Sequence, residues 1–178
     1  MQGLVDFASQ IGLLFAVLLQ PACYLGALGL FIHAGWGFWR QSQPDNPYRG
    51  RPWVPAVSLV LCGVLASFDT FLTKANVSAG STVVVGLTDL VSYTPTAAPG
   101  SLLGASPGAM IVNVVALFLN FFQAFGAMAC LVAVLAWHAS ITGRSNRSRL
   151  ACGVQFAFGI LLINVLTVST WLVGIFKV

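Results

Sequence analysis

Long apolar stretches separated by short polar segments are the main pattern of this chain. The first stretch is uncharged from Phe7 to Trp39, and three more apolar runs follow it. About 20 apolar residues are enough for a helix to cross the hydrocarbon core of a bilayer. We therefore predict an all-α fold in a single membrane domain, 1–178, with four transmembrane helices. Their predicted ranges are about 11–38, 53–72, 109–137 and 150–176.

The composition supports a membrane location. Charged residues make up 7% of the chain and hydrophobic residues 58%, and the mean hydropathy is +0.90. An ordinary soluble domain contains about 25% charged residues. A soluble fold of 178 residues could not bury this much apolar surface, so we predict an integral, multi-pass membrane protein whose surroundings are membrane lipids.

The basic residues predict the orientation. Six of the eight lie in the two polar segments between spans one and two and between spans three and four. Short loops rich in arginine face the cytoplasm, so both termini and the long segment 73–108 are predicted to lie on the non-cytoplasmic side. The net charge of +4 needs no nucleic-acid partner, because no basic stripe with stacking aromatics accompanies it. The cytoplasmic anchors are Arg40, Arg49, Arg51, Arg144, Arg147 and Arg149.

Five amide side chains lie within the third and fourth spans. Amides in lipid are costly unless they find partners, so we interpret them first as hydrogen-bonding links between helices. The alternative is that they line the lumen of a pore. These candidates are Asn113, Asn120, Gln123, Gln155 and Asn164.

The segment 73–108 is rich in Ser, Thr, Gly, Ala and Pro. Its apolar part, Thr82 to Val91, is too short to cross a membrane. A short strand, an interfacial helix and a re-entrant piece all remain open for it. Asp69, near the outer end of the second span, is expected to pair with Lys74, about one turn away.

The chain contains no phosphate-binding loop, dinucleotide fingerprint, zinc-protease motif or nucleophile elbow. We therefore predict no enzyme activity, no catalytic residue, no cofactor and no metal site. His33 and His138 lie near cytoplasmic helix ends, where they could share a metal or a proton, but interfacial packing is the preferred interpretation. The four cysteines are interpreted as packing residues. The two halves show no paired broken helices in the sequence, which disfavours an inverted-repeat carrier.

The region from Tyr24 to about Leu72 resembles a known family. A Tyr-Leu-Gly start leads into a helix with small residues, then a polar loop with prolines and arginines, then an apolar span with Cys62 and Gly63. This order resembles the small polytopic inner-membrane proteins of the IcmC/DotE and TraQ group. That group belongs to the Dot/Icm and IncI-type conjugation branch of type IV secretion. The resemblance covers about a quarter of the chain in detail and the remainder in size and layout.

The resemblance implies a structural or assembly subunit of a bacterial type IV secretion or conjugative transfer apparatus. Its location would be the bacterial inner membrane, and its partners would be other subunits of the apparatus. Lateral packing of helices would allow a homo-oligomer or a pilus-like assembly. The alternative function, motivated by the amides, is an oligomeric membrane channel or small-solute transporter.

Overall fold

The structure is a computed structural model that describes residues 2–46, 48–81, 83–86 and 107–176. All regular elements in these ranges are helices, so the predicted all-α class is confirmed for the described part of the chain. The helices are α1 (Gln2–Gln41), α2 (Val54–Ala66), α3 (Phe68–Ser78), α4 (Pro107–Leu117), α5 (Leu119–Ile141), α6 (Arg149–Ile163) and α7 (Val165–Phe176).

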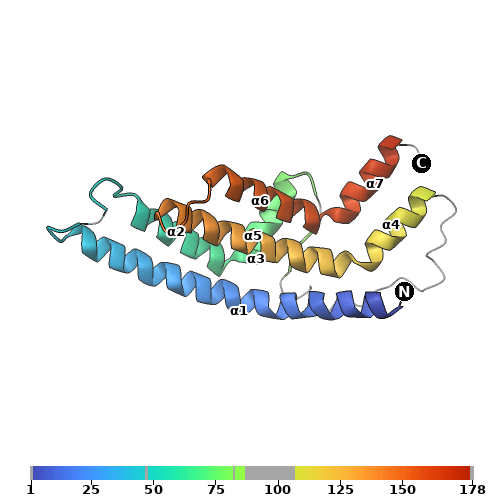
Figure 1. The fold of residues 1–178 in the computed structure, drawn as a ribbon, viewed down its shortest axis with the longest axis horizontal. Helices are drawn as coiled ribbons and strands as arrows, with labels where there is room; N and C mark the ends of the chain where they lie inside the picture. Colours follow the sequence, from blue (N-terminus) through green and yellow to red (C-terminus); the bar gives the residue numbers. More distant parts are fainter. Residues whose placement is uncertain (1, 47, 82, 87–106, 177–178) are drawn as a thin grey trace.

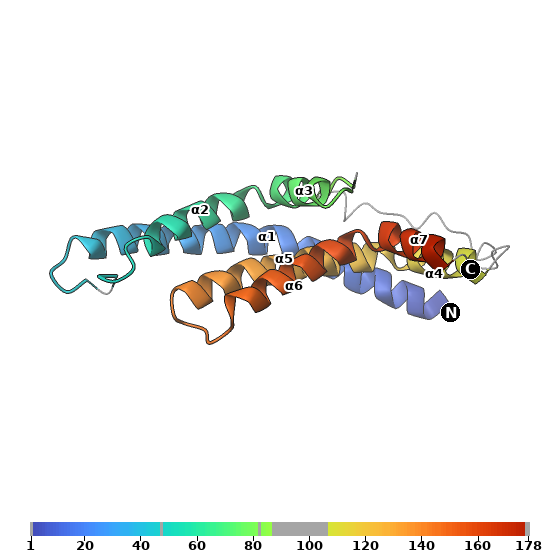
Figure 2. The same cartoon turned by 90° about the horizontal axis from the view of Figure 1, so that it is seen from above.

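The helices form two antiparallel hairpins that lie side by side (Figure 1). In the first hairpin, α1 is followed by α2 and α3. In the second, α4 and α5 are followed by α6 and α7. The loops between α1 and α2 and between α5 and α6 lie at one end of the bundle, and the two ends of the chain lie toward the other (Figure 2). All six loop arginines therefore belong to the same end, which we call the basic end.

Two helices are long and apolar enough to cross a membrane alone, α1 from Asp6 to Gln41 and α5. With 40 residues, α1 is about 60 Å long, roughly twice the thickness of the hydrocarbon core. Pro21 lies inside α1 without ending the helix. The remaining candidates are bent pairs, so the described residues hold two spans, or up to four if each bent pair is one span.

Both return helices are broken. The axes of α2 and α3 differ by 89° at Ser67, and those of α6 and α7 differ by 80° at Asn164. These residues lie inside the predicted spans 53–72 and 150–176, which are therefore not straight helices. The predicted span 109–137 likewise contains the end of α4, a one-residue break at Phe118 and the start of α5. The expectation that paired broken helices are absent is wrong, because hydropathy alone does not register a bend.

The core lies where the hairpins meet. Buried residues on α1 recur every three or four positions and form one face of the helix. Most of the remaining α1 surface is apolar and exposed, including Leu25, Phe31 and Ile32, as expected of a helix that faces lipid. The buried face of α1 consists of Ala16, Leu19, Cys23, Ala27, Leu30 and Ala34.

Glycines set the spacing within each hairpin. A Cβ on Gly126 of α5 would lie 2.7 Å from the carbonyl oxygen of Gly159 on α6, so these two backbones are in direct contact. In the first hairpin, a Cβ on Gly26 would meet the end of the Leu65 side chain at 3.0 Å. Gly29 and Gly153, two other small residues of the spans, face open space. Small residues therefore permit close approach at only some of their positions.

A left-handed glycine ends α3 and turns the chain back along it. Gly80 has φ +81°, and the amide of Ser81 donates to the carbonyl of Asn76 at 3.0 Å, which is the six-to-one bond of a Schellman motif. Residues 83–86 then run without helix beside α3, and the amide of Val85 donates to Thr73 Oγ1 at 3.1 Å. The remaining part of the predicted 82–91 element, 82 and 87–91, lies outside the described residues.

Candidate functional site

Buried polar side chains gather at two places. One group, which we call the amide junction, consists of Asn76, Ser81 and Asn164 and lies at the bent end of the bundle. The other, which we call the histidine junction, consists of His33, Ser58 and His138 and lies toward the basic end. Each junction joins elements from both hairpins.

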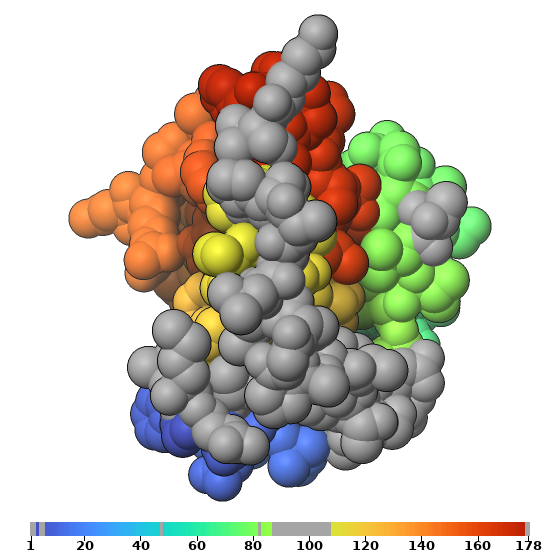
Figure 3. All heavy atoms as spheres, turned by 90° about the vertical axis from the view of Figure 1, so that its right-hand side faces the viewer, coloured from blue at the N-terminus to red at the C-terminus, as the bar shows by residue number. Residues whose placement is uncertain are grey.

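The amide junction links the two bent helices. Asn164 Nδ2 donates to Asn76 Oδ1 at 3.0 Å and to the carbonyl of Ile160 at 2.9 Å. Ser81 Oγ donates to Asn164 Oδ1, and Asn76 Nδ2 donates to the carbonyl of Val83 at 3.3 Å. All three junction side chains are buried, Asn76 completely. In the view along the bundle from this end, the N-terminal part of α1, in blue, lies below α7, in red (Figure 3).

The position of Asn164 explains why the hydrogen bonds of the amide junction stabilise the bent helix. Asn164 is the residue at which α6 ends, so its amide bonds stabilise the break itself. With 15 residues, α6 spans about 22 Å, which places Asn164 within the depth of a bilayer core of about 30 Å when Arg149 lies at the interface. An amide at that depth is costly without partners. The described contacts supply them, so the predicted role of Asn164 as an interhelical link fits its geometry.

The histidine junction joins α1, α2 and α5. The rings of His33 and His138 meet edge to face, with centroids 5.2 Å apart. Ser58 Oγ lies 2.8 Å from His138 Nε2 and 3.0 Å from the carbonyl of Val54. The hydroxyl has a single proton, so both bonds form when Ser58 donates to Val54 and the Nε2–H of His138 donates to Ser58. His33 Nε2 is buried and has no partner among the described residues.

The two histidines therefore meet through their rings, while the hydrogen bond of His138 goes to Ser58. Within the described part of the chain, no group of three or more His, Cys, Asp or Glu side chains is arranged to hold a metal ion. The interpretation of the two histidines as packing residues at helix ends stays a prediction.

Three of the predicted amides lie along α4 and the start of α5. Asn120 is buried, and its Oδ1 has no partner in the described structure. Asn113 and Gln123 are half-buried. Beside Asn120, α1 passes very close to α5, since a Cβ on Gly12 would lie 3.2 Å from the Cα of Phe121. Asn120 therefore lies at the interface between α1 and α5.

Gln155 links the two helices of the second hairpin to the basic loop. Its Oε1 accepts from Arg147 Nη1 at 3.3 Å, and its Nε2 lies 3.5 Å from the carbonyl of Ala129. Arg40 lies over the ring of Trp36, 5.7 Å from the centroid, a cation–π contact typical of an interfacial anchor. The other loop arginines have exposed side chains: Arg49, Arg51, Arg144, Arg147 and Arg149.

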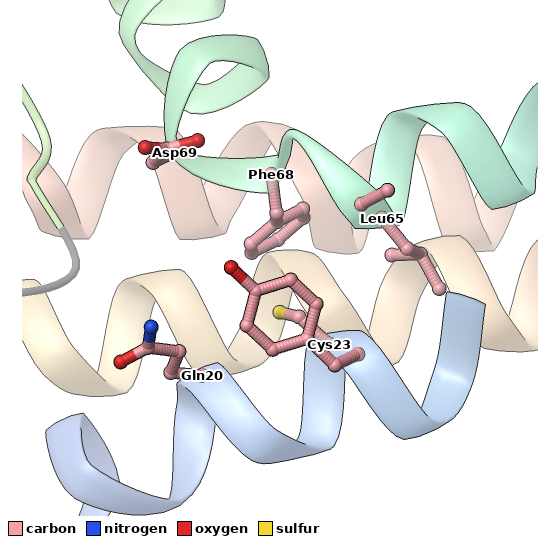
Figure 4. A pocket seen from close by; sticks show the side chains of 7 residues that line it. Gln20, Cys23, Leu65, Phe68 and Asp69 are labelled. Atoms are coloured by element: carbon pink, nitrogen blue, oxygen red, sulfur yellow. The ribbon is translucent and has the colours of Figure 1, made fainter. Parts of the chain in front are cut away.

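Asp69 lies at the break between α2 and α3, beside a small cavity of about 80 Å³. In Figure 4, Asp69 lies on the opposite side of this cavity from Gln20 and Cys23 of α1, and the ring of Phe68 points between the helices. The carboxylate accepts from the amide of Thr70 at 2.7 Å. The predicted pair with Lys74 does not form among the described contacts, because Asp69 instead bonds within the first turn of α3.

Comparison of the chain with models of protein families, with characterised proteins and with solved structures finds no match. The fold and the two junctions are therefore interpreted from this chain alone.

The sequence analysis missed three junction residues, Ser58, Asn76 and Ser81. Asn76 and Ser81 lie in segment 73–108, which was predicted to lie outside the spans on the non-cytoplasmic side, and Ser58 is a single hydroxyl in an apolar span. A weak signal of the histidine junction exists in the sequence, since the dipeptide His-Ala occurs at 33–34 and again at 138–139. Each occurrence lies near the carboxyl end of a long helix, α1 or α5.

Proposed function

We propose that this chain is a non-catalytic structural subunit of a type IV secretion or conjugative transfer apparatus in the bacterial inner membrane. In this proposal the basic end faces the cytoplasm, and both termini lie on the other side. The resemblance of the region around Tyr24 to Leu72 to the IcmC/DotE and TraQ group gives the class of apparatus. The observation that carries a structural role is that the buried amides and histidines link helices of the same chain.

The outer surface supports an assembly role. After the break at Asn164, α7 leaves the direction of α6 at 80°, and its apolar residues Trp171, Ile175 and Phe176 are exposed. Such a projecting helix offers an apolar surface for lateral packing against other membrane subunits or a second copy of the chain. Packing between membrane helices is driven by van der Waals contacts and occasional hydrogen bonds, which this surface can supply.

Deletion of the gene from a strain with a working transfer apparatus tests the proposal. We expect DNA or protein transfer to be lost and to return with the intact gene. The double variant Trp171→Ala with Phe176→Ala should reduce the other subunits that co-purify in mild detergent. The matched control is Phe31→Ala with Trp36→Ala, also two exposed aromatics, on α1. Normal transfer by the deletion strain would overturn the proposal.

The alternative, an oligomeric channel or small-solute transporter, is favoured by one observation. Both return helices are broken at corresponding places of the two hairpins, and broken helices form substrate sites in many transporters. A small cavity lies at one of these breaks, and the carboxylate of Asp69 is part of its lining. Solute flux into liposomes that is lost in Asp69→Asn, but kept in the loop variant Asp45→Asn, would favour this alternative over a structural role.

A further inference from the structure

A second, larger cavity lies between the two hairpins. It is a groove of about 360 Å³ whose walls come from α2, α5 and α6, with Phe71 of α3 at one end. Almost all of its lining is apolar, including Leu61 and Val64 on one side and Ala133 and Trp137 on the other. The single charged residue in the lining is Arg149.

The groove has a basic end at Arg149 and an apolar end at Phe71 and Phe156. On α6 its lining residues Arg149, Gly153 and Phe156 follow one another at helical spacing, so they share one face. Arg149 is the first residue of α6, at the basic end of the bundle. Seven residues further along, the ring of Phe156 contacts that of Phe71, with centroids 5.7 Å apart. A groove of this form accepts an apolar chain that carries an anionic group at its outer end.

The electrostatics at the outer end also favour an anion. The guanidinium of Arg149 has no carboxylate partner among the described residues, and its side chain is exposed. The N-terminus of α6 has neither a side-chain cap nor an acidic residue in its first turn, so the positive end of the helix dipole is not compensated there. Arg144 and Arg147 of the same loop add positive charge nearby, while Asp45 is the acidic residue of the basic-end loops.

We propose that this groove binds one acyl chain of an anionic phospholipid, with the phosphate of the headgroup at Arg149. The lipid would fill the space between the two hairpins and connect them. Basic pockets between transmembrane helices on the cytoplasmic side are a common form of lipid site. A nucleic acid would satisfy the arginine but would leave the apolar groove empty, so the lipid is the better fit.

Native mass spectrometry of the full chain, purified in mild detergent and titrated with phosphatidylglycerol or phosphatidylcholine, tests this. We expect phosphatidylglycerol to bind more tightly, and Arg149→Gln to weaken its binding about fivefold, the usual contribution of one basic residue at a lipid surface. Arg51→Gln removes the same charge from the other basic loop and should leave binding unchanged. Glycerol phosphate, which has no acyl chain, should not compete.

A second variant tests the apolar part separately. A side chain on Gly153 would enter open space, so Gly153→Leu should fold normally, fill part of the groove and weaken binding of both lipids. Its control is Gly35→Leu on α1, which also faces open space. The proposal is overturned if both Arg149→Gln and Gly153→Leu bind phosphatidylglycerol like the unaltered chain. It is also overturned if a DNA oligonucleotide displaces the lipid while glycerol phosphate and phosphatidylcholine do not. Neither outcome depends on the proposed role in secretion.

Discussion

Each hairpin pairs a long helix, α1 or α5, with a bent return helix, but the two hairpins are held together differently. In the second hairpin, the backbones of α5 and α6 touch at Gly126 and Gly159. In the first, α1 and α2 meet through side chains, with Leu65 over Gly26 and Pro55 over Gly37. Backbone contacts leave no room for adjustment, whereas the end of a leucine side chain can move. The helix contact at Gly126 is therefore more sharply specified than the one at Gly26.

The breaks in the two return helices also differ in the hydrogen bonds that hold them. Asn164, at the break of the second hairpin, is buried and bonds to both Asn76 and Ser81. Ser67, at the break of the first, is exposed, and among the described residues its hydroxyl donates only to the carbonyl of Gly63, one turn earlier on α2. The direction of α3 after the first break is therefore fixed by the second hairpin, because Asn76 on α3 is hydrogen-bonded to Asn164. The comparison indicates that contacts with the second hairpin hold α3 in its position.

The largest effect is expected from a methyl group at the backbone contact. Gly126→Ala places a Cβ 2.7 Å from the Gly159 carbonyl, so α5 and α6 must separate. We expect a loss of about 1–3 kcal/mol in the free energy of unfolding, measured by reversible unfolding in mixed micelles. Gly26→Ala is the matched change in the first hairpin and should cost less than about 1 kcal/mol, because Leu65 can rotate and alanine favours the helix. Equal losses in the two variants would contradict the difference between the hairpins.

The apolar runs of the sequence predicted the helical class and the apolar helices typical of a membrane protein, because both follow from average hydropathy. It did not predict the breaks, since Ser67 and Asn164 occur in straight membrane helices as well as at bends. The interhelical role of Asn164 was predicted from the cost of a lone amide in lipid, but its partners were not. Asn76 and Ser81 lie more than 80 positions away in the chain, and only the turn at Gly80 brings Ser81 back to α3.

The next effect concerns the amide junction. Asn164→Leu removes the hydrogen bond to Asn76 of α3 and the one from Ser81 in the turn after α3, and leaves the buried Asn76 Oδ1 without that donor. We expect a loss of about 1–2 kcal/mol and faster amide hydrogen exchange in α3. Ser67→Ala, at the other break, removes one bond within a helix and should change stability by less than about 0.5 kcal/mol. If Ser67→Ala speeded amide hydrogen exchange in α3 more than Asn164→Leu does, the inference that the second hairpin holds α3 in position would be wrong.

A smaller effect is expected at the histidine junction, which links the hairpins at the basic end. Ser58→Ala removes the bond between α2 and His138 of α5 and should cost about 0.6 kcal/mol, the average for a hydrogen bond between membrane helices. Ser78→Ala is the control, because among the described residues its hydroxyl donates only to the Lys74 carbonyl on the same helix. A loss of 3 kcal/mol or more would mean that the first hairpin depends on this link far more than a single average bond explains.

The smallest effect on stability is expected at Asn120, and it distinguishes a residue in a helix interface from one that lines a lumen. The Asn120 side chain is buried between α5 and α1, and its Oδ1 accepts no bond from the described residues. A buried acceptor without a partner costs free energy, so Asn120→Leu should leave the free energy of unfolding unchanged or raise it by up to about 1 kcal/mol. Gln123→Leu, one turn away and half-buried, is the comparison. If Asn120 lined a water-filled lumen, its replacement would instead abolish solute flux in liposomes at unchanged stability. Unchanged assembly together with equal or higher stability would place Asn120 among the packing residues of the two hairpins.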